Sequence, residues 1–218
     1  MDRTQRMEST MPNQPKSGEF FILEAGTING PSCGVVFENL ATLLSPPRLI
    51  LRPEGGRVPA LRETPRLVYS PSKGPPPKDL EPGFSGYWLV TERLHHVMAS
   101  VDPNAFAFAE VDYRLADGSK GPRHFLCTVV QEIDALDEEA SKLFIDTTED
   151  FINGKFYDLT GGTSVTFKRD LLGSAHVFKT PYTSRVFCDR SFKDAAAAAG
   201  IETDSDADGM WFIDASDI

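Results

Sequence analysis

The stretch YWLVTERLHHVMASVDP, residues 87–103, decides the fold because a strand, a helix start and a helix stop follow one another in it. Residues 87–90 are apolar and β-prone, which predicts a buried strand. Thr91 is the expected N-cap, since its hydroxyl can accept a hydrogen bond from a free backbone N–H. Asp102-Pro103 ends the helix, because proline disfavours helical geometry in the residue before it. The apolar side chains at helical spacing on one face are Leu94, Val97, Met98 and Val101.

A second unit of this kind lies about a hundred residues further along the chain. Residues 186–188 predict a strand, and Asp189 is placed to cap the helix that follows. That helix runs through the alanines of residues 195–199 and stops at Gly200. The recurrence is compatible with an internal duplication, although strand–cap–helix units are common in α/β proteins.

The remaining runs predict strands and turns. Residues 106–115 and 124–130 suggest a hairpin, with Asp117-Gly118 in its loop. A second hairpin is expected from residues 156–157 and 165–167, with Gly161-Gly162 as its turn. Shorter strands are predicted at 20–23, 35–37, 49–51, 67–69, 176–178 and 210–213. The sequence therefore predicts an α/β (α+β) fold with a mainly antiparallel or mixed sheet and a few packing helices.

Three segments differ in composition. Residues 1–18 are polar and are expected to be a disordered tail. Residues 19–84 read as an N-terminal strand- and loop-rich part of the fold, and 85–218 as the main α/β domain. Within the loop-rich part, the proline-rich stretch 71–83 is the expected exposed connection.

Composition and charge restrict the function. The 218 residues are 40% hydrophobic and include 15 Phe, so the chain can bury a core without disulfides or metal. The net charge of −10 disfavours direct binding to nucleic acid or to an anionic membrane, and it suits a basic protein partner. It is equally compatible with an acidic surface that only maintains solubility. Cys33, Cys127 and Cys188 form no CxxC pair, which favours a reducing compartment and a cytoplasmic location. We expect no secretory signal and no membrane-spanning segment.

Motifs for metal binding or catalysis are weak. Asp204, Asp206, Asp208 and Gly209 imitate the start of a calcium-binding loop, but Ala215 stands where that loop needs glutamate. His95 and His96 are adjacent on a helix and so point apart, and His124 and His176 lie at strand starts without a partnered motif. Nucleophile-elbow and phosphate-loop signatures are missing from the sequence. We therefore expect no metal, no cofactor and no catalytic residue.

Several segments together resemble a known family. They are residues 88–94, 125–139, 175–179, 185–200 and 209–214. In order and spacing they are similar to immunity protein family eleven of bacterial polymorphic-toxin systems, over roughly residues 85–218. The resemblance implies a cytoplasmic protein that binds a cognate toxin and blocks its active site or its substrate path. It also implies toxins that are often nucleases, delivered by contact-dependent or type VI secretion, and it carries over no catalytic residues.

The acidic excess lies in the part that carries this resemblance. Residues 81–218 hold 12 Lys/Arg and 24 Asp/Glu, so their net charge is 12 − 24 = −12. A nuclease presents Lys and Arg to phosphates, and acidic loops on an inhibitor would compete for them. The expected partner-binding residues are Glu132, Asp134, Asp137, Glu138, Glu139, Asp146, Glu149 and Asp150. Two other classes stay open: a small hydrolase or transferase whose site the sequence does not reveal, and an acidic adaptor module.

Overall fold

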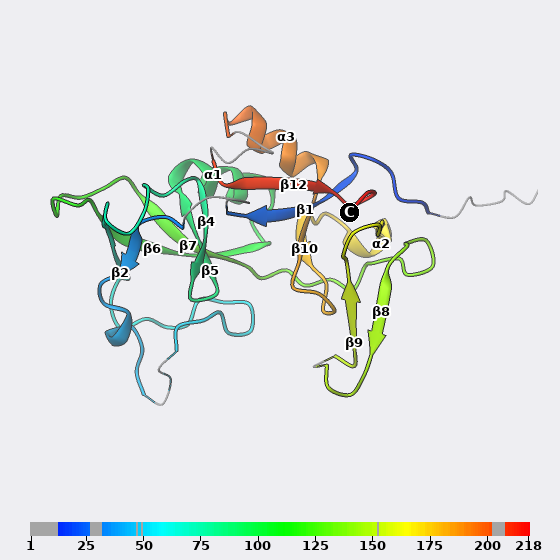
Figure 1. Ribbon diagram of the computed structural model, residues 1–218, viewed down its shortest axis with the longest axis horizontal. Coiled ribbons are helices and arrows are strands. Elements are labelled where there is room, and N and C mark those ends of the chain that lie inside the picture. The colour runs from blue at the N-terminus through cyan, green and yellow to red at the C-terminus, as the bar shows by residue number, and fades with distance from the viewer. Residues whose placement is uncertain (1–12, 27–31, 47, 49, 152, 202–207) are drawn as a thin grey trace, which may run out of the picture.

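The computed structural model describes residues 13–26, 32–46, 48, 50–151, 153–201 and 208–218. Strands dominate, and they form a six-stranded sheet, a four-stranded sheet and a separate two-stranded ribbon (Figure 1). All strand pairs are antiparallel except one, so the predicted α+β class with mixed and antiparallel sheets is confirmed. Among the described residues, none of the helices has the length and apolar content needed to cross a bilayer.

The four-stranded sheet joins the two ends of the chain. Its order is β10 (Val177–Lys179), β11 (Val186–Asp189), β1 (Phe20–Ala25) and β12 (Met210–Asp214). β1 is a central strand because it is apolar on both faces. Phe20 and Ile22 pack into one buried cluster, and Phe21 and Leu23 pack into another on the opposite face.

The six-stranded sheet contains the predicted central hairpin. Its order is β2 (Val35–Phe37), β3 (Arg66–Tyr69), β6 (Phe106–Arg114), β7 (His124–Val129), β5 (Tyr87–Thr91) and β4 (Leu80–Phe84). β3 and β6 form the one parallel pair. A short 3-10 helix, η1 (Leu40–Thr42), lies between β2 and β3. Leu43, Leu44 and Leu51, from the loops around it, cover one face of this sheet.

Both predicted helices begin where their caps indicate. In α1 (Glu92–Val101) the N–H of Leu94 donates to the Thr91 hydroxyl at 3.4 Å. In α3 (Arg190–Ala198) the N–H of Phe192 donates to Asp189 at 3.2 Å. Gly200, just past the end of α3, has a φ of +75°, a conformation that glycine adopts without a Cβ penalty. A third, one-turn helix is α2 (Arg169–Leu172).

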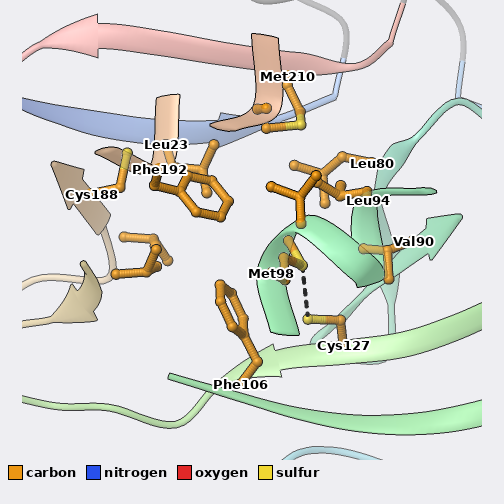
Figure 2. Packing of buried hydrophobic residues seen from close by; sticks show 14 of the residues in the cluster. Leu23, Leu80, Val90, Leu94, Met98, Phe106, Cys127, Cys188, Phe192 and Met210 are labelled. Carbon is orange, nitrogen blue, oxygen red and sulfur yellow. Dashed lines mark hydrogen bonds between the residues drawn. The ribbon is translucent and has the colours of Figure 1, made fainter. Parts of the chain in front are cut away.

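α1 and α3 pack together and share one core with both large sheets. Figure 2 shows Leu94 and Met98 of α1 together with Phe192 of α3, Leu23 of β1 and Phe106 of β6. In the same cluster the Cys127 thiol lies 3.9 Å from the Met98 sulfur. The two strand–cap–helix units therefore meet across this core instead of forming separate domains.

The prediction that residues 156–157 and 165–167 pair as a hairpin is wrong. β9 (Lys155–Asp158) pairs with β8 (Phe144–Thr147), which the sequence reading did not recognise as a strand. Val165 instead donates its N–H to the carbonyl of Ala215 at 2.7 Å. The reason is burial: residues 165–167 are core side chains, whereas β8 is exposed along its whole length and shows no apolar alternation.

The prediction that residues 71–83 form an exposed connection is wrong at the C-terminal end of this stretch. Residues 80–84 form β4, where Leu80 and Glu81 are buried. Pro82 is tolerated because β4 is an edge strand and because its pairing with β5 shifts register between Glu81 and Phe84. Near the start of the stretch, Gly74 meets Gly34 so closely that a Cβ on Gly74 would lie 2.3 Å from the carbonyl oxygen of Ser32.

The segment before β1 contacts the body of the protein. The Asn13 side chain donates to the carbonyl of Phe167 at 2.9 Å. The Ser17 hydroxyl and the Gly18 N–H both donate to Asp214, at 2.8 and 2.7 Å. Residues 1–12 of the predicted tail lie outside the described residues.

Candidate partner-binding surface

The eight acidic residues expected to bind a partner fall in two places. One group, 132–139, follows β7, and the other, 146–150, lies on β8 and the turn after it. Both belong to the layer that packs on one face of the four-stranded sheet, the face that carries Phe20 and Phe178. There, Leu136 and Tyr157 pack in one cluster with Phe20 and Phe178. Figure 1 shows the β8–β9 ribbon beside that sheet, with its turn pointing away.

Three of the five carboxylates of the first group accept hydrogen bonds from other groups of the chain, although most of the group is exposed. Glu138 accepts hydrogen bonds from the Lys155 ammonium and, at 2.6 Å, from the Tyr157 hydroxyl. Asp137 accepts from the Ala140 N–H at 3.4 Å, and Asp134 accepts from the Tyr182 hydroxyl at 3.3 Å. These carboxylates hold neighbouring segments together.

Two members of the first group differ from the rest. Glu132 pairs through its backbone with Lys179. Glu139 is exposed, and its carboxylate has no hydrogen bond or ion pair within the part of the chain that the structure describes.

Glu138 and Lys155 stabilise each other's charged forms. Its hydrogen bonds from Lys155 and Tyr157 hold the pKa of its carboxyl below the ordinary value. Burial opposes the charge on Lys155, but the bonds to Glu138 and Tyr157 outweigh it and raise the pKa of the ammonium. Both groups are therefore charged at neutral pH and attach β9 to the loop before β8.

The second group has no such partners. Asp146, Glu149 and Asp150 are exposed, and none forms an ion pair with another described residue. The Asp150 carboxylate accepts a hydrogen bond from the hydroxyl of its neighbour Thr148 at 3.4 Å. Three negative charges therefore lie on the ribbon and its turn without a cation paired to them among the described residues.

The register of the ribbon gives it two different faces. Ile145 lies opposite Tyr157, and Thr147 opposite Lys155, so these four side chains share one face. Tyr157 is 1% exposed, which shows that this face lies against the body of the protein at β9, whereas Ile145 and Thr147 of β8 are exposed. The other face, which we call the outward face, carries Phe144, Asp146, Phe156 and Asp158.

The outward face alternates aromatic and acidic side chains. Phe144 lies opposite Asp158, and Asp146 lies opposite Phe156. Phe144 is 62% exposed and Phe156 is 37% exposed, and the ring of Phe151 stacks on that of Phe156 at 5.6 Å between centroids. Of the fifteen phenylalanines, all of which the structure describes, Phe144 and Phe156 are the most exposed.

A groove runs along the β9 side of the ribbon. It encloses about 570 Å³ between the ribbon and the loop that joins β10 to β11. Phe151, Phe156 and Tyr182 give it aromatic walls, Glu132 and Asp150 contribute carboxylates, and Lys155 contributes an ammonium. The structure thus brings one residue from each predicted acidic group to a single groove.

Sequence reasoning missed Phe144 and Phe156. The available signal was the pair of short motifs Phe144-Ile145-Asp146 and Lys155-Phe156-Tyr157-Asp158, in which apolar and acidic residues mix within a strand-length segment. Residues 144–147 gave no strand prediction, because neither face of this segment is uniformly apolar, and residues 156–157 were predicted as a strand but with residues 165–167 as the partner. Only the pairing of the two strands reveals that aromatic and acidic side chains share one face.

Several side chains from the motifs considered for metal binding or catalysis pack or form ion pairs within the fold. The His95 ring stacks on Phe125 at 4.1 Å, and burial lowers the pKa of the buried His124. Asp208 forms an ion pair with Arg93 at 3.3 Å, while Asp204 and Asp206 lie outside the described residues. The described part of the chain contains no group of three or more potential metal ligands.

Comparison with known proteins gives one family match. Residues 19–217 match the model described as Immunity protein family (Imm11). The match begins at β1, so it includes the N-terminal segment that the resemblance, placed at residues 85–218, had left out. No curated protein matches the chain.

Proposed function

Because the chain belongs to the immunity protein family Imm11, we propose that it binds a cognate bacterial toxin and neutralises it as a stoichiometric inhibitor, without chemical turnover. The observation that carries the proposal is the family match over residues 19–217, which spans both sheets and the ribbon. The protein would be the immunity partner of an effector–immunity pair in a polymorphic toxin system, used in competition between bacteria.

A nuclease-type effector is the proposed target. A nuclease must present Lys and Arg where it holds phosphates. The net charge of −10, and the exposed carboxylates of Asp146, Glu149 and Asp150, complement such a surface. Long-range attraction between the two would speed association and favour occlusion of the basic active site.

The cytoplasm is the proposed site of action, with delivery of the toxin by type VI secretion or by contact. The three cysteines are all free, and Cys127 and Cys188 are buried in the core. Burial raises the pKa of both thiols, which keeps them protonated and unreactive. A fold that needs no disulfide suits a reducing compartment.

Co-expression with the toxin domain encoded beside this chain tests the proposal. We expect the toxin alone to stop growth, and co-expression of this chain to restore growth and yield a co-purifying complex in a one-to-one ratio. Equal killing with and without this chain would reject the proposal. Turnover of a small substrate by the pure chain would favour the hydrolase or transferase alternative instead.

A further inference from the structure

Resting on the proposed function, we propose that the outward face of the β8–β9 ribbon is the surface on which the basic toxin docks, with Phe144 and Phe156 as its apolar anchors. The acidic residues of the ribbon form the rim around them. Glu138 of the 132–139 group, by contrast, holds the ribbon in place.

Selective exposure is the first argument. Phe144 and Phe156, on neighbouring strands, are the two most exposed of the fifteen phenylalanines, at 62% and 37%. Aromatic side chains dominate the energetics of interface centres, because they bury a large area with few rotatable bonds. Two exposed aromatic rings on one small face therefore mark a centre of binding.

Charge is the second argument, and it selects the partner. Residues 144–158 contain one Lys and four Asp/Glu, so their net charge is 1 − 4 = −3. The single cation, Lys155, lies on the opposite face and is paired with Glu138. The outward face and its turn thus present carboxylates around aromatic rings, a combination that fits Lys and Arg side chains with apolar residues between them.

Preorganisation is the third argument. Glu138 fixes β9 through Lys155 and Tyr157, and the Tyr157 N–H donates to the carbonyl of Tyr182 at 2.8 Å. At the turn, the Asn153 side chain donates to the carbonyl of Pro181 at 2.6 Å. A two-stranded ribbon alone is marginally stable, so these attachments keep the docking face ordered before the toxin arrives.

The groove beside the ribbon extends the same surface. The Lys155 ammonium already lies over the Tyr182 ring, 4.0 Å from its centroid. The remaining aromatic walls, Phe151 and Phe156, together with the carboxylates of Glu132 and Asp150, suit a guanidinium or ammonium group that stacks on a ring while it pairs with a carboxylate. The groove would receive a Lys or Arg side chain at the edge of the docked toxin.

Binding kinetics with the purified toxin domain test this proposal. Phe144→Ser and Phe156→Ser should each raise Kd about 30-fold, mainly through faster dissociation. Ile50→Ser is the matched control, because Ile50 is 69% exposed and lies outside the ribbon; its Kd should stay within about twofold of wild type. Thermal melts of Phe144→Ser and Ile50→Ser should match wild type, since these side chains mostly face solvent, whereas Phe156→Ser also loses the stacking contact with Phe151 and should melt slightly earlier.

Charge variants compare the carboxylates of the ribbon with an exposed carboxylate outside it. Asp146→Lys combined with Asp150→Lys should slow association about tenfold at low salt, and the effect should shrink as salt rises. Glu139→Lys, which changes an exposed carboxylate outside the ribbon, should slow association much less.

The outcomes distinguish this proposal from the proposed function. Tight binding by wild type with unchanged binding by both Phe variants would overturn the ribbon as the docking surface and leave the immunity function intact. A wild-type chain that does not bind the toxin would overturn both. A concentration-dependent dimer of the chain alone, lost in the Phe variants, would assign the face to self-association and overturn the toxin as its occupant.

Discussion

The hydroxyl of Tyr157 donates a hydrogen bond of 2.6 Å to the carboxylate of Glu138. This contact joins a strand of the exposed ribbon to the acidic loop that follows β7. An acidic residue expected at a partner interface therefore positions the ribbon.

Glu138→Gln should loosen the ribbon. The variant loses the ion pair with Lys155 while the amide oxygen can still accept from Tyr157. Since the Glu138 side chain is 40% exposed, solvent screening limits the loss to about 1 kcal/mol, or about a fivefold rise in local opening. Hydrogen exchange of the β8 and β9 amides measures it, with Glu139→Gln as the control that should leave exchange unchanged.

Acid should have the same effect on the wild-type protein. The pKa of Glu138 is lowered in the fold, so its contribution is present above the ordinary glutamate pKa of about 4.3. The contribution is lost as the pH falls through the lowered folded value. Protection of the ribbon amides should therefore fall in acid in wild type and change less in Glu138→Gln. Parallel loss in both proteins would contradict this role.

Asp102→Ala should destabilise the whole fold. Asp102 is 5% exposed and accepts hydrogen bonds from the N–H groups of His176 and Val177, at 2.7 and 3.1 Å, and from Gln131 at 3.2 Å. Removing the carboxylate leaves these donors without their acceptor, which costs about 3 kcal/mol. Urea unfolding measures the loss, and Asp102→Asn, which retains an acceptor oxygen, should lose less. Equal stability of the alanine variant and wild type would refute this account.

Thr91→Ala should weaken the start of α1. The Thr91 hydroxyl accepts from the Leu94 N–H and donates to the buried Asp79, which also pairs with Arg93. Loss of the cap and of this donor should cost about 1–2 kcal/mol. Thr91→Ser keeps the hydroxyl and is the control. Thermal unfolding should show a clear loss of stability in the alanine variant and a much smaller loss in the serine variant.

Glu81→Gln should stabilise the protein at neutral pH. Burial raises the pKa of Glu81, so the folded state disfavours its charged form, although the Lys78 N–H donates to it at 2.9 Å. A raised carboxyl pKa means that stability falls as the pH rises from the unfolded value through the folded one. The glutamine keeps the acceptor and avoids the charge.

The expected gain for Glu81→Gln at pH 7 is about 1 kcal/mol, or about 3 °C in Tm. The difference from wild type should shrink toward pH 4, where the wild-type carboxyl is protonated as well. A lower Tm for the variant at pH 7 would show that the charge is stabilising in its site.

The sequence alone determined the parts of the fold that depend on near neighbours. Thr91 and Asp189 mark helix starts because a cap bonds a backbone N–H three residues away, and Gly200 marks a helix end for an equally local reason. The β6–β7 hairpin was predicted because its loop and its apolar runs are contiguous. The acidic excess, and the segments that carry the family resemblance, are likewise visible in the chain itself.

Tertiary structure decided what depends on distant pairing. The apolar runs at 156–157 and 165–167 look alike in sequence, but β9 pairs with β8 while Val165 bonds to Ala215, fifty residues away. Strand partners are selected by which faces become buried, and no local signal encodes that choice. For the same reason only the folded chain shows that Glu138 faces Lys155, and that Phe144 and Phe156 are left in solvent beside Asp146 and Asp158.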